Sequence, residues 1–174
     1  PIEWGTWEKL TPDSEVAILT FGPMVYESLK AREILMTSGI ETSIINARFI
    51  KPFDYTMLNK IRNQYKTIIT IEEAQLRGGF GESIGSYLLQ SGWSGKFKTL
   101  GVEDRFVTHG DREQLIAEVG LDAEGIAKSI TEVIGVARKS PNFLQKLRFL
   151  RSGEPKKKIA AGGSEEILIS SKDE

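Results

Sequence analysis

The chain has 174 residues, which is enough for one domain with a hydrophobic core and too few for two ordinary domains. Its 23 basic and 24 acidic residues leave a formal net charge of -1, so the chain as a whole has no strong attraction to nucleic acid or to an anionic membrane, and we expect neither as a partner. There is no cysteine, which excludes disulfides, and no apolar run long enough to cross a membrane, so we expect a cytoplasmic protein, or one of a plastid-type organelle in a plastid-bearing eukaryote.

Short apolar runs alternate with helical patterns through the first hundred residues. Residues 16–21 predict a strand buried on both faces, and an amphipathic helix follows over 24–38, ended by a left-handed Gly39. Asp54 is a candidate cap for a short helix. Further strands are predicted over 43–47, 67–71 and 96–102, and a further helix runs from the glycine-rich stretch to about Leu89. Because helices separate the strands, we expect a mostly parallel sheet with helices on both faces.

The second half of the chain predicts more helices and then a tail. Asp111 with Gln114 predicts a helix that ends at Gly120, and Asp122 caps another over residues 123–137. We divide the chain into a domain over 1–137, an additional basic helix over 138–151 that begins near Pro141, and a flexible tail over 152–174. Within that tail, Ile167-Leu168-Ile169 could add to a sheet edge. The start at Pro1 rather than Met favours a piece of a longer protein.

A glycine-rich stretch, Gly79-x-Gly81-x-x-x-Gly85, follows the strand predicted over 67–71 and raises the question of a phosphate loop. Six residues separate the strand from Gly78, and Glu82 in the first helical turn would compete with a phosphate for the positive end of the helix dipole. Gly81 and Gly85 share a helical face, where glycine costs about 1 kcal/mol relative to alanine unless close packing offsets it. The stretch therefore predicts close packing, within the domain or against a neighbour.

Other polar residues follow the predicted strands. Glu72 and Glu73 end one strand, at the edge where open α/β sheets bind ligands, and we favour a partner contact for them. Arg48 either holds a phosphate or carboxylate or forms an ion pair with those glutamates. The single histidine, His109, lies on a loop and favours a structural or interface role over acid–base chemistry. Trp4 and Trp7 predict packing residues.

These residues predict no catalytic, cofactor or metal site in the chain. The candidate interface or sheet-edge residues are Arg48, Glu72, Glu73, Gly78, Gly79, Gly81, Gly85, Asp104, Arg105 and His109. A small-ligand regulatory module at the same edge is the alternative.

Five stretches occur in an order that resembles a known family. They read VAILTFG from Val16, NARFIKPFD from Asn46, TIEE from Thr70 with GGFG from Gly78, DRFVTHG from Asp104, and GLDAEGI from Gly120. Over about residues 1–136 they resemble the C-terminal domain of 1-deoxy-D-xylulose-5-phosphate synthase, a transketolase-like thiamine diphosphate enzyme. Transketolases and the beta subunits of 2-oxoacid dehydrogenases share several of these stretches and remain alternatives.

The resemblance implies a three-layer α/β/α domain with a mostly parallel five-stranded sheet, one of whose edge strands, near Trp7 to Leu10, is antiparallel. Whole enzymes of this family are dimers that condense pyruvate with glyceraldehyde 3-phosphate, with loss of carbon dioxide, for isoprenoid, thiamine and pyridoxal synthesis. They use thiamine diphosphate and magnesium, which upstream domains hold. The resemblance thus implies that this chain is inactive alone, binds no cofactor, and packs on the upstream domains and on a second subunit.

Overall fold

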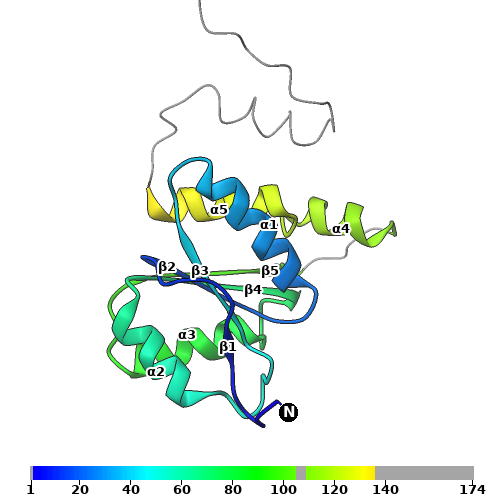
Figure 1. Ribbon diagram of the computed structural model, residues 1–174. Helices are drawn as coiled ribbons and strands as arrows, with labels where there is room; N and C mark the ends of the chain where they lie inside the picture. Colours follow the sequence, from blue (N-terminus) through cyan, green and yellow to red (C-terminus); the bar gives the residue numbers. More distant parts are fainter. Residues whose placement is uncertain (1, 105–108, 136–174) are drawn as a thin grey trace, which may run out of the picture.

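The centre of the structure, a computed structural model that describes residues 2–104 and 109–135, is a five-stranded sheet (Figure 1). Its strands are β1 (Glu8–Lys9), β2 (Val16–Thr20), β3 (Thr42–Asn46), β4 (Thr67–Gln75) and β5 (Lys96–Val102), in the spatial order β1-β3-β2-β4-β5. β1 pairs antiparallel with β3, and the other neighbours pair in parallel. The predicted mixed sheet with an antiparallel edge strand is confirmed.

Helices cover both faces of this sheet (Figure 1). The helices α1 (Met24–Met36), α4 (Arg112–Glu118) and α5 (Ala123–Ile134) lie on one face, and α2 (Tyr55–Gln64) and α3 (Phe80–Gln90) lie on the other. Two hydrophobic clusters fill the spaces between the layers. One joins α1 and α5 to the sheet, and the other joins α2 and α3 to it. The predicted three-layer α/β/α architecture is therefore confirmed.

Burial along the strands explains their sequences. Every residue of β2 is buried, as expected for a central parallel strand that is covered by helices on both faces. By contrast, β5 alternates between exposed and half-buried residues from Lys96 to Thr99, with Leu100 its one buried residue, and it is the last strand of the sheet. An edge strand needs only one row of backbone partners, and its lysines keep the outer side polar.

Side chains and glycines define most helix ends as predicted. Asp54 accepts the N–H of Met57 at 2.8 Å, and Asp122 accepts that of Gly125 at 2.9 Å. Asp111 precedes α4 but makes no side-chain capping bond, so the predicted capping box is wrong; α4 is attached to the sheet through Arg112 instead. The helix α5 ends before the predicted residue 137 because Gly135 adopts a left-handed φ of 77°.

The N-terminal segment is attached through one of its two tryptophans. Trp7 is buried, and its indole N–H donates to the Phe49 carbonyl at 2.9 Å. Asp54 also accepts the Trp7 backbone N–H at 2.9 Å, so one carboxylate ties this segment to the start of α2. Trp4 differs from the prediction because it contacts Phe49 edge-on at a ring separation of 5.5 Å but remains 61% exposed.

Three predictions fall on residues outside the described ranges: Arg105, the helix over 138–151 and the tail over 152–174, including Ile167-Leu168-Ile169. In the part of the chain that the structure describes, no helix is both long and apolar enough to span a membrane.

Candidate functional site

The two adjacent glutamates lie inside β4 rather than after it. The strand continues to Gln75, four residues beyond its predicted end, and its pairing with β5 is irregular between Ile71 and Gln75. Because side chains alternate along a strand, Glu72 and Glu73 point to opposite faces of the sheet. Glu72 faces α3 and is 1% exposed, whereas Glu73 faces α4 and is partly exposed.

The Glu72 carboxylate binds the beginning of α3. Its two oxygens accept the backbone N–H groups of Phe80 and Gly81, each at 2.9 Å. These N–H groups have no acceptor within the helix, and they lie at the positive end of its dipole. A buried carboxylate is stable there because two charge-assisted hydrogen bonds replace its hydration.

Glycines make the space for this carboxylate. A Cβ on Gly79 would lie 2.5 Å from a Glu72 oxygen and 2.5 Å from the Gln75 carbonyl oxygen. A Cβ on Gly101, in β5, would lie 3.0 Å from the Ala74 carbonyl oxygen and 3.2 Å from Cγ of Glu72. Gly78 has a left-handed φ of 72°, which lets the chain turn from β4 toward α3.

Gly81 and Gly85 place α3 directly on the sheet. A Cβ on Gly81 would lie 2.5 Å from the Thr70 hydroxyl oxygen, and one on Gly85 would lie 2.7 Å from the Phe97 ring. The close approach predicted from the glycine spacing is confirmed, and within the domain rather than against a neighbour.

Two carboxylates occupy the region where a phosphate would bind. Glu82 lies in the first turn of α3, as predicted, and accepts the Gly78 N–H, while Glu72 accepts the N–H groups of Phe80 and Gly81. The bonds of Glu72 were not predicted because this residue lies eight residues before Phe80, outside the local capping patterns that a sequence displays. An anion in this position would have to displace a carboxylate that is already bound.

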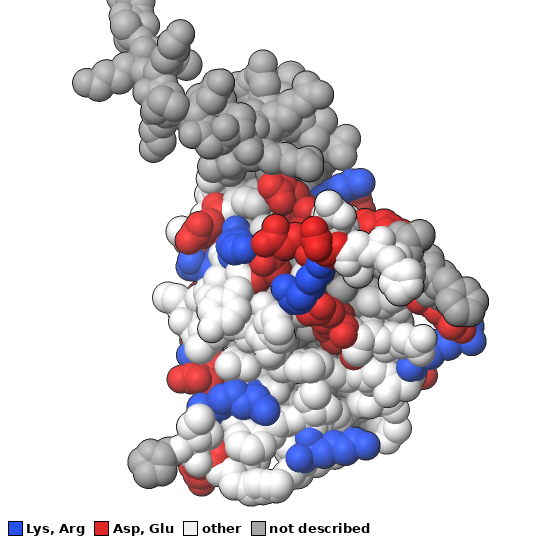
Figure 2. All heavy atoms as spheres, turned by 90° about the vertical axis from the view of Figure 1, so that its right-hand side faces the viewer, with Lys and Arg blue, Asp and Glu red and all other residues white. Residues whose placement is uncertain are grey.

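Glu73 belongs to a charged surface on the other face of the sheet. Its carboxylate pairs with Arg112, with Nε of the arginine 3.0 Å from Oε1, and this hydrogen bonding raises the pKa of the Arg112 guanidinium. Glu27 pairs with Lys30 on α1 at 2.8 Å and raises the pKa of the Lys30 ammonium. Glu113 helps to raise both pKa values, and Glu124 helps to raise that of Lys30. Figure 2 shows acidic side chains gathered over this part of the molecule.

Arg48 lies apart from the glutamates of β4, and its expected ion pair with them is wrong. Its guanidinium contacts the N-terminal segment instead, at 3.3 Å from the Thr6 carbonyl oxygen, 3.2 Å from the Thr6 hydroxyl and 3.4 Å from Glu8. The antiparallel pairing of β1 with β3 places Glu8 opposite Asn46, near Arg48. Sequence reasoning missed this partner because 40 residues separate the two charges.

Asp104 and His109 are exposed, and Arg105 lies outside the described residues. Of the described candidate residues, Glu72 lies with Gly79 and Gly81, whereas Arg48 contacts the N-terminal segment and Glu73 faces α4. Among the described residues, no group of three or more His, Cys, Asp or Glu side chains is placed to bind a metal ion.

An aromatic surface, which we define as Trp4, Phe49, Phe53, Tyr55 and Tyr87, was not predicted. Tyr55 is 55% exposed and lies between Phe53 and Tyr87, at ring separations of 6.1 and 5.8 Å. Trp7 connects this group to Trp4 and Phe49 through its contact with Phe53 and its bond to the Phe49 carbonyl. The aromatic residues lie in three separate segments, so no local pattern indicates that they meet.

Comparison with known proteins gives one family. The family model described as "Transketolase, C-terminal domain" matches residues 5–126. The 1-deoxy-D-xylulose-5-phosphate synthase of Aquifex aeolicus is 41% identical over 133 residues, covering 76% of this chain and 21% of the synthase. The synthase of a Synechococcus strain (JA-3-3Ab) is 42% identical over 130 residues, with 75% and 20% covered.

Solved structures agree on the fold. A split-gene transketolase, described as an inactive beta4 tetramer, has a TM-score of 0.68 and 24% identity over 79% of this chain and 44% of that one. A transketolase from Pichia stipitis has a TM-score of 0.55 and 16% identity over 76% of this chain and 18% of that one. At such identities the likeness shows the fold alone.

Proposed function

The chain belongs to the family of transketolase C-terminal domains, and from this premise we propose that it is the C-terminal assembly domain of a 1-deoxy-D-xylulose-5-phosphate synthase. It spans about a fifth of the length of the curated relatives it matches. Identity of 41–42% to the synthases, against 24% or less to the transketolase structures above, favours the synthase over a transketolase.

The proposed parent enzyme condenses pyruvate with glyceraldehyde 3-phosphate, releasing carbon dioxide, and its product supplies isoprenoid, thiamine and pyridoxal synthesis. Thiamine diphosphate and magnesium supply the carboligation chemistry when bound. The relatives named above are bacterial enzymes, and the proposal places the parent in the cytoplasm.

The described residues do not fit the diphosphate or its metal. The helix N-terminus that would suit a diphosphate already binds Glu72, and no cluster of metal-ligating side chains occurs in residues 2–104 and 109–135. We therefore assign no cofactor residue or catalytic step to this chain. Its role in the proposal is to pack on the upstream domains and on the second subunit.

Two observations together carry the proposal: the N-terminus of α3 is already bound by a carboxylate of the same chain, and an aromatic surface is exposed. Glu72 fills the position where a ligand would bind α3, while Trp4 and Tyr55 remain more than half exposed. Aromatic side chains are enriched in the centres of protein interfaces because they bury large apolar areas at low entropic cost. We propose that the aromatic surface packs on the upstream domains.

A domain exchange tests the proposal. In the Aquifex aeolicus synthase, the region that matches this chain is replaced by residues 1–135, and carboligation of pyruvate with glyceraldehyde 3-phosphate is measured. We expect an active chimera, and we expect the same chimera with Tyr55→Glu to lose activity while the isolated 174-residue chain with that change melts normally. The matched control is Ser86→Glu, which adds a charge at an exposed position of α3.

Two results would contradict the proposal. One is turnover by the isolated chain, because an assembly domain has no activity of its own. The other is a chimera that assembles to its normal size and is inactive, because assembly alone would then not be the contribution of this domain.

A further inference from the structure

The outer side of β5 is an open sheet edge. Among the described strands, β5 pairs only with β4. On its inner side, the Lys96 N–H donates to the Lys66 carbonyl at 2.8 Å, and the Val102 carbonyl accepts from the next strand at 3.0 Å, so the even-numbered residues bond toward β4. Because backbone groups alternate along a strand, the N–H and C=O groups that point to the open side are those of Phe97, Thr99 and Gly101. Such an edge can pair with another extended strand.

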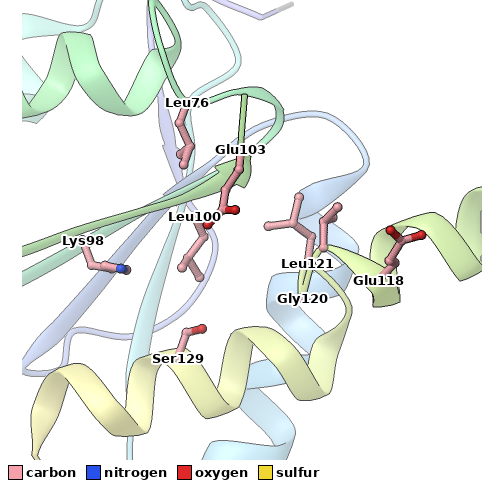
Figure 3. A pocket seen from close by; sticks show the side chains of 10 residues that line it. Leu76, Lys98, Leu100, Glu103, Glu118, Gly120, Leu121 and Ser129 are labelled. Carbon is pink, nitrogen blue, oxygen red and sulfur yellow. The ribbon is translucent and has the colours of Figure 1, made fainter. Parts of the chain in front are cut away.

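A groove lies beside this edge, between β5 and the helices α4 and α5. It has a volume of about 300 Å³. Figure 3 shows Leu100 of β5 and Ser129 of α5 pointing into it, with Lys98 and Glu118 on opposite sides of Leu100. The remaining lining side chains are Leu76, Glu103, Val119 and Leu121. The groove therefore combines an apolar floor with charged side chains of both signs.

The charges along this edge are separated by sign. Both lysines of β5 lie in the first half of the strand, whereas Glu103 and Asp104 follow its end and Glu118 lines the groove. These three acids outnumber Arg105, the next residue in the sequence, which lies outside the described ranges. The edge therefore runs from a basic first half to an acidic end.

Two of these charges, Lys98 and Glu103, have no partner in the part of the chain that the structure describes. Within residues 2–104 and 109–135, their side chains form no hydrogen bond or ion pair, and both residues are exposed. By contrast, the Lys96 ammonium donates to the carbonyl oxygens of Val133 and Ile134, at 3.1 and 3.3 Å. Lys98 and Glu103 are therefore available to a partner.

A second copy of β5 that runs antiparallel matches this separation of charge. Parallel copies would place lysines beside lysines and acids beside acids, which is unfavourable. Antiparallel copies place the basic half of each strand beside the acidic end of the other. A strand of a single charge would match only half of this edge, and the lysines repel basic strands.

We propose that β5 pairs antiparallel with β5 of a second copy of the chain, which joins two five-stranded sheets into one. In the register centred on Leu100, Thr99 exchanges backbone hydrogen bonds with Gly101 of the second copy, and Lys98 lies beside Glu103 of the second copy. The two Leu100 residues face each other at the two-fold axis. The pairing concerns the 174-residue chain and does not rest on the function proposed above.

Sedimentation of the 174-residue chain tests the pairing. We expect a monomer–dimer equilibrium between about 10 μM and about 1 mM, because a single strand pair makes a small interface. In amide hydrogen exchange, the outward amides of Phe97, Thr99 and Gly101 should exchange at least about tenfold more slowly at the highest concentration than at the lowest. The amides of Lys98 and Leu100, which bond to β4, serve as internal references.

A charge exchange tests the orientation of the two strands. Lys98→Glu and Glu103→Lys each place like charges side by side twice in the dimer, so each should raise the dissociation constant at least about tenfold. An equimolar mixture of the two variants restores association, because opposite charges meet again in the mixed dimer. The matched controls, Lys60→Glu and Glu41→Lys, make the same charge changes at exposed positions away from β5 and leave the dissociation constant unchanged.

A chain that stays monomeric to about 1 mM overturns the proposal. A dimer that neither charge variant weakens also overturns it, because the interface then lies on another surface. If both variants weaken the dimer but their mixture does not associate, the strands do not meet in the antiparallel arrangement, and the proposal is equally overturned.

Discussion

The two glutamates at positions 72 and 73 are neighbours in sequence and opposites in surroundings. Glu72 is 1% exposed and accepts two backbone N–H groups, whereas Glu73 is on the surface and pairs with Arg112. A carboxylate inside a protein has a large effect on stability because its loss leaves buried donors without acceptors. A carboxylate at the surface has a small effect because water and salt replace its partner. The two glutamates therefore differ in their expected effect on stability because side chains alternate along β4, so that Glu72 points into the core and Glu73 points to the surface.

The largest effect is expected from Glu72→Ala, which leaves the N–H groups of Phe80 and Gly81 without an acceptor. We expect a loss of about 2–5 kcal/mol in the free energy of unfolding, measured by urea denaturation. Glu72→Gln keeps the shape and one acceptor oxygen, so its loss is smaller. Added formate should stabilise Glu72→Ala and leave the parent chain unchanged, because only the variant has room for an anion at α3. An unchanged urea midpoint in Glu72→Ala would remove the contrast between the two glutamates.

The next effect concerns the glycines that bring α3 onto the sheet. Gly85→Leu places a side chain where Phe97 lies, and overpacking of this kind costs about 1–3 kcal/mol. Thermal melting measures it. The adjacent exposed position provides the control, since Ser86→Leu should change the stability by no more than about 0.5 kcal/mol. Equal melting temperatures for the two variants would show that α3 can move away from the sheet at no cost.

A smaller effect is expected from Glu73→Gln. The ion pair with Arg112 is exposed to solvent, so its contribution should disappear in about 1 M salt, where the screening length is about 3 Å. The measurement is a urea midpoint at low and high salt, with Glu72→Gln as the comparison. The difference in urea midpoint between Glu72→Gln and the parent chain should persist at high salt. A salt-resistant effect of Glu73→Gln would mean that both glutamates stabilise the fold in the same way.

The smallest effect is the alkaline behaviour of Lys30. Glu27 raises the pKa of the Lys30 ammonium, so the folded state holds this proton more tightly than the unfolded state does. The stabilisation is therefore complete below about pH 10.5 and is lost as the pH rises through the higher pKa of the folded state. Lys30→Met should flatten that decline by a few tenths of a kcal/mol in melts recorded from about pH 9 to 12. An unchanged slope would show that the pair contributes nothing in solution.

Local patterns in the sequence were sufficient for most of the fold. Buried apolar runs identified β2, β3 and β4, an alternating pattern identified β5, and Asp54 and Asp122 cap the predicted helices. The antiparallel edge strand came from the family resemblance, since two exposed residues in β1 give no pattern of their own. The spacing of Gly81 and Gly85 indicated close packing because a glycine within a helix needs a compensating contact.

The partners of charged side chains could not be predicted in the same way. Arg48 pairs with Glu8 and Arg112 pairs with Glu73, over separations of 40 and 39 residues. Which charges meet depends on strand order and on the position of a helix over the sheet, and several acids were possible for each arginine. Trp4 shows the same limit for apolar residues, because its exposure depends on the path of the N-terminal segment, where it contacts Phe49.

The carboxylate at the start of α3 also constrains how this domain can evolve. A nucleotide or sugar phosphate could use the helix N-terminus only after Glu72 is lost, and the loss alone would leave two buried N–H groups without acceptors. The first mutation on that route therefore lowers the stability of the domain before the binding of any ligand can offset the loss. New binding sites in descendants of this domain are more accessible on its outer surfaces, where a substitution does not first have to break the fold.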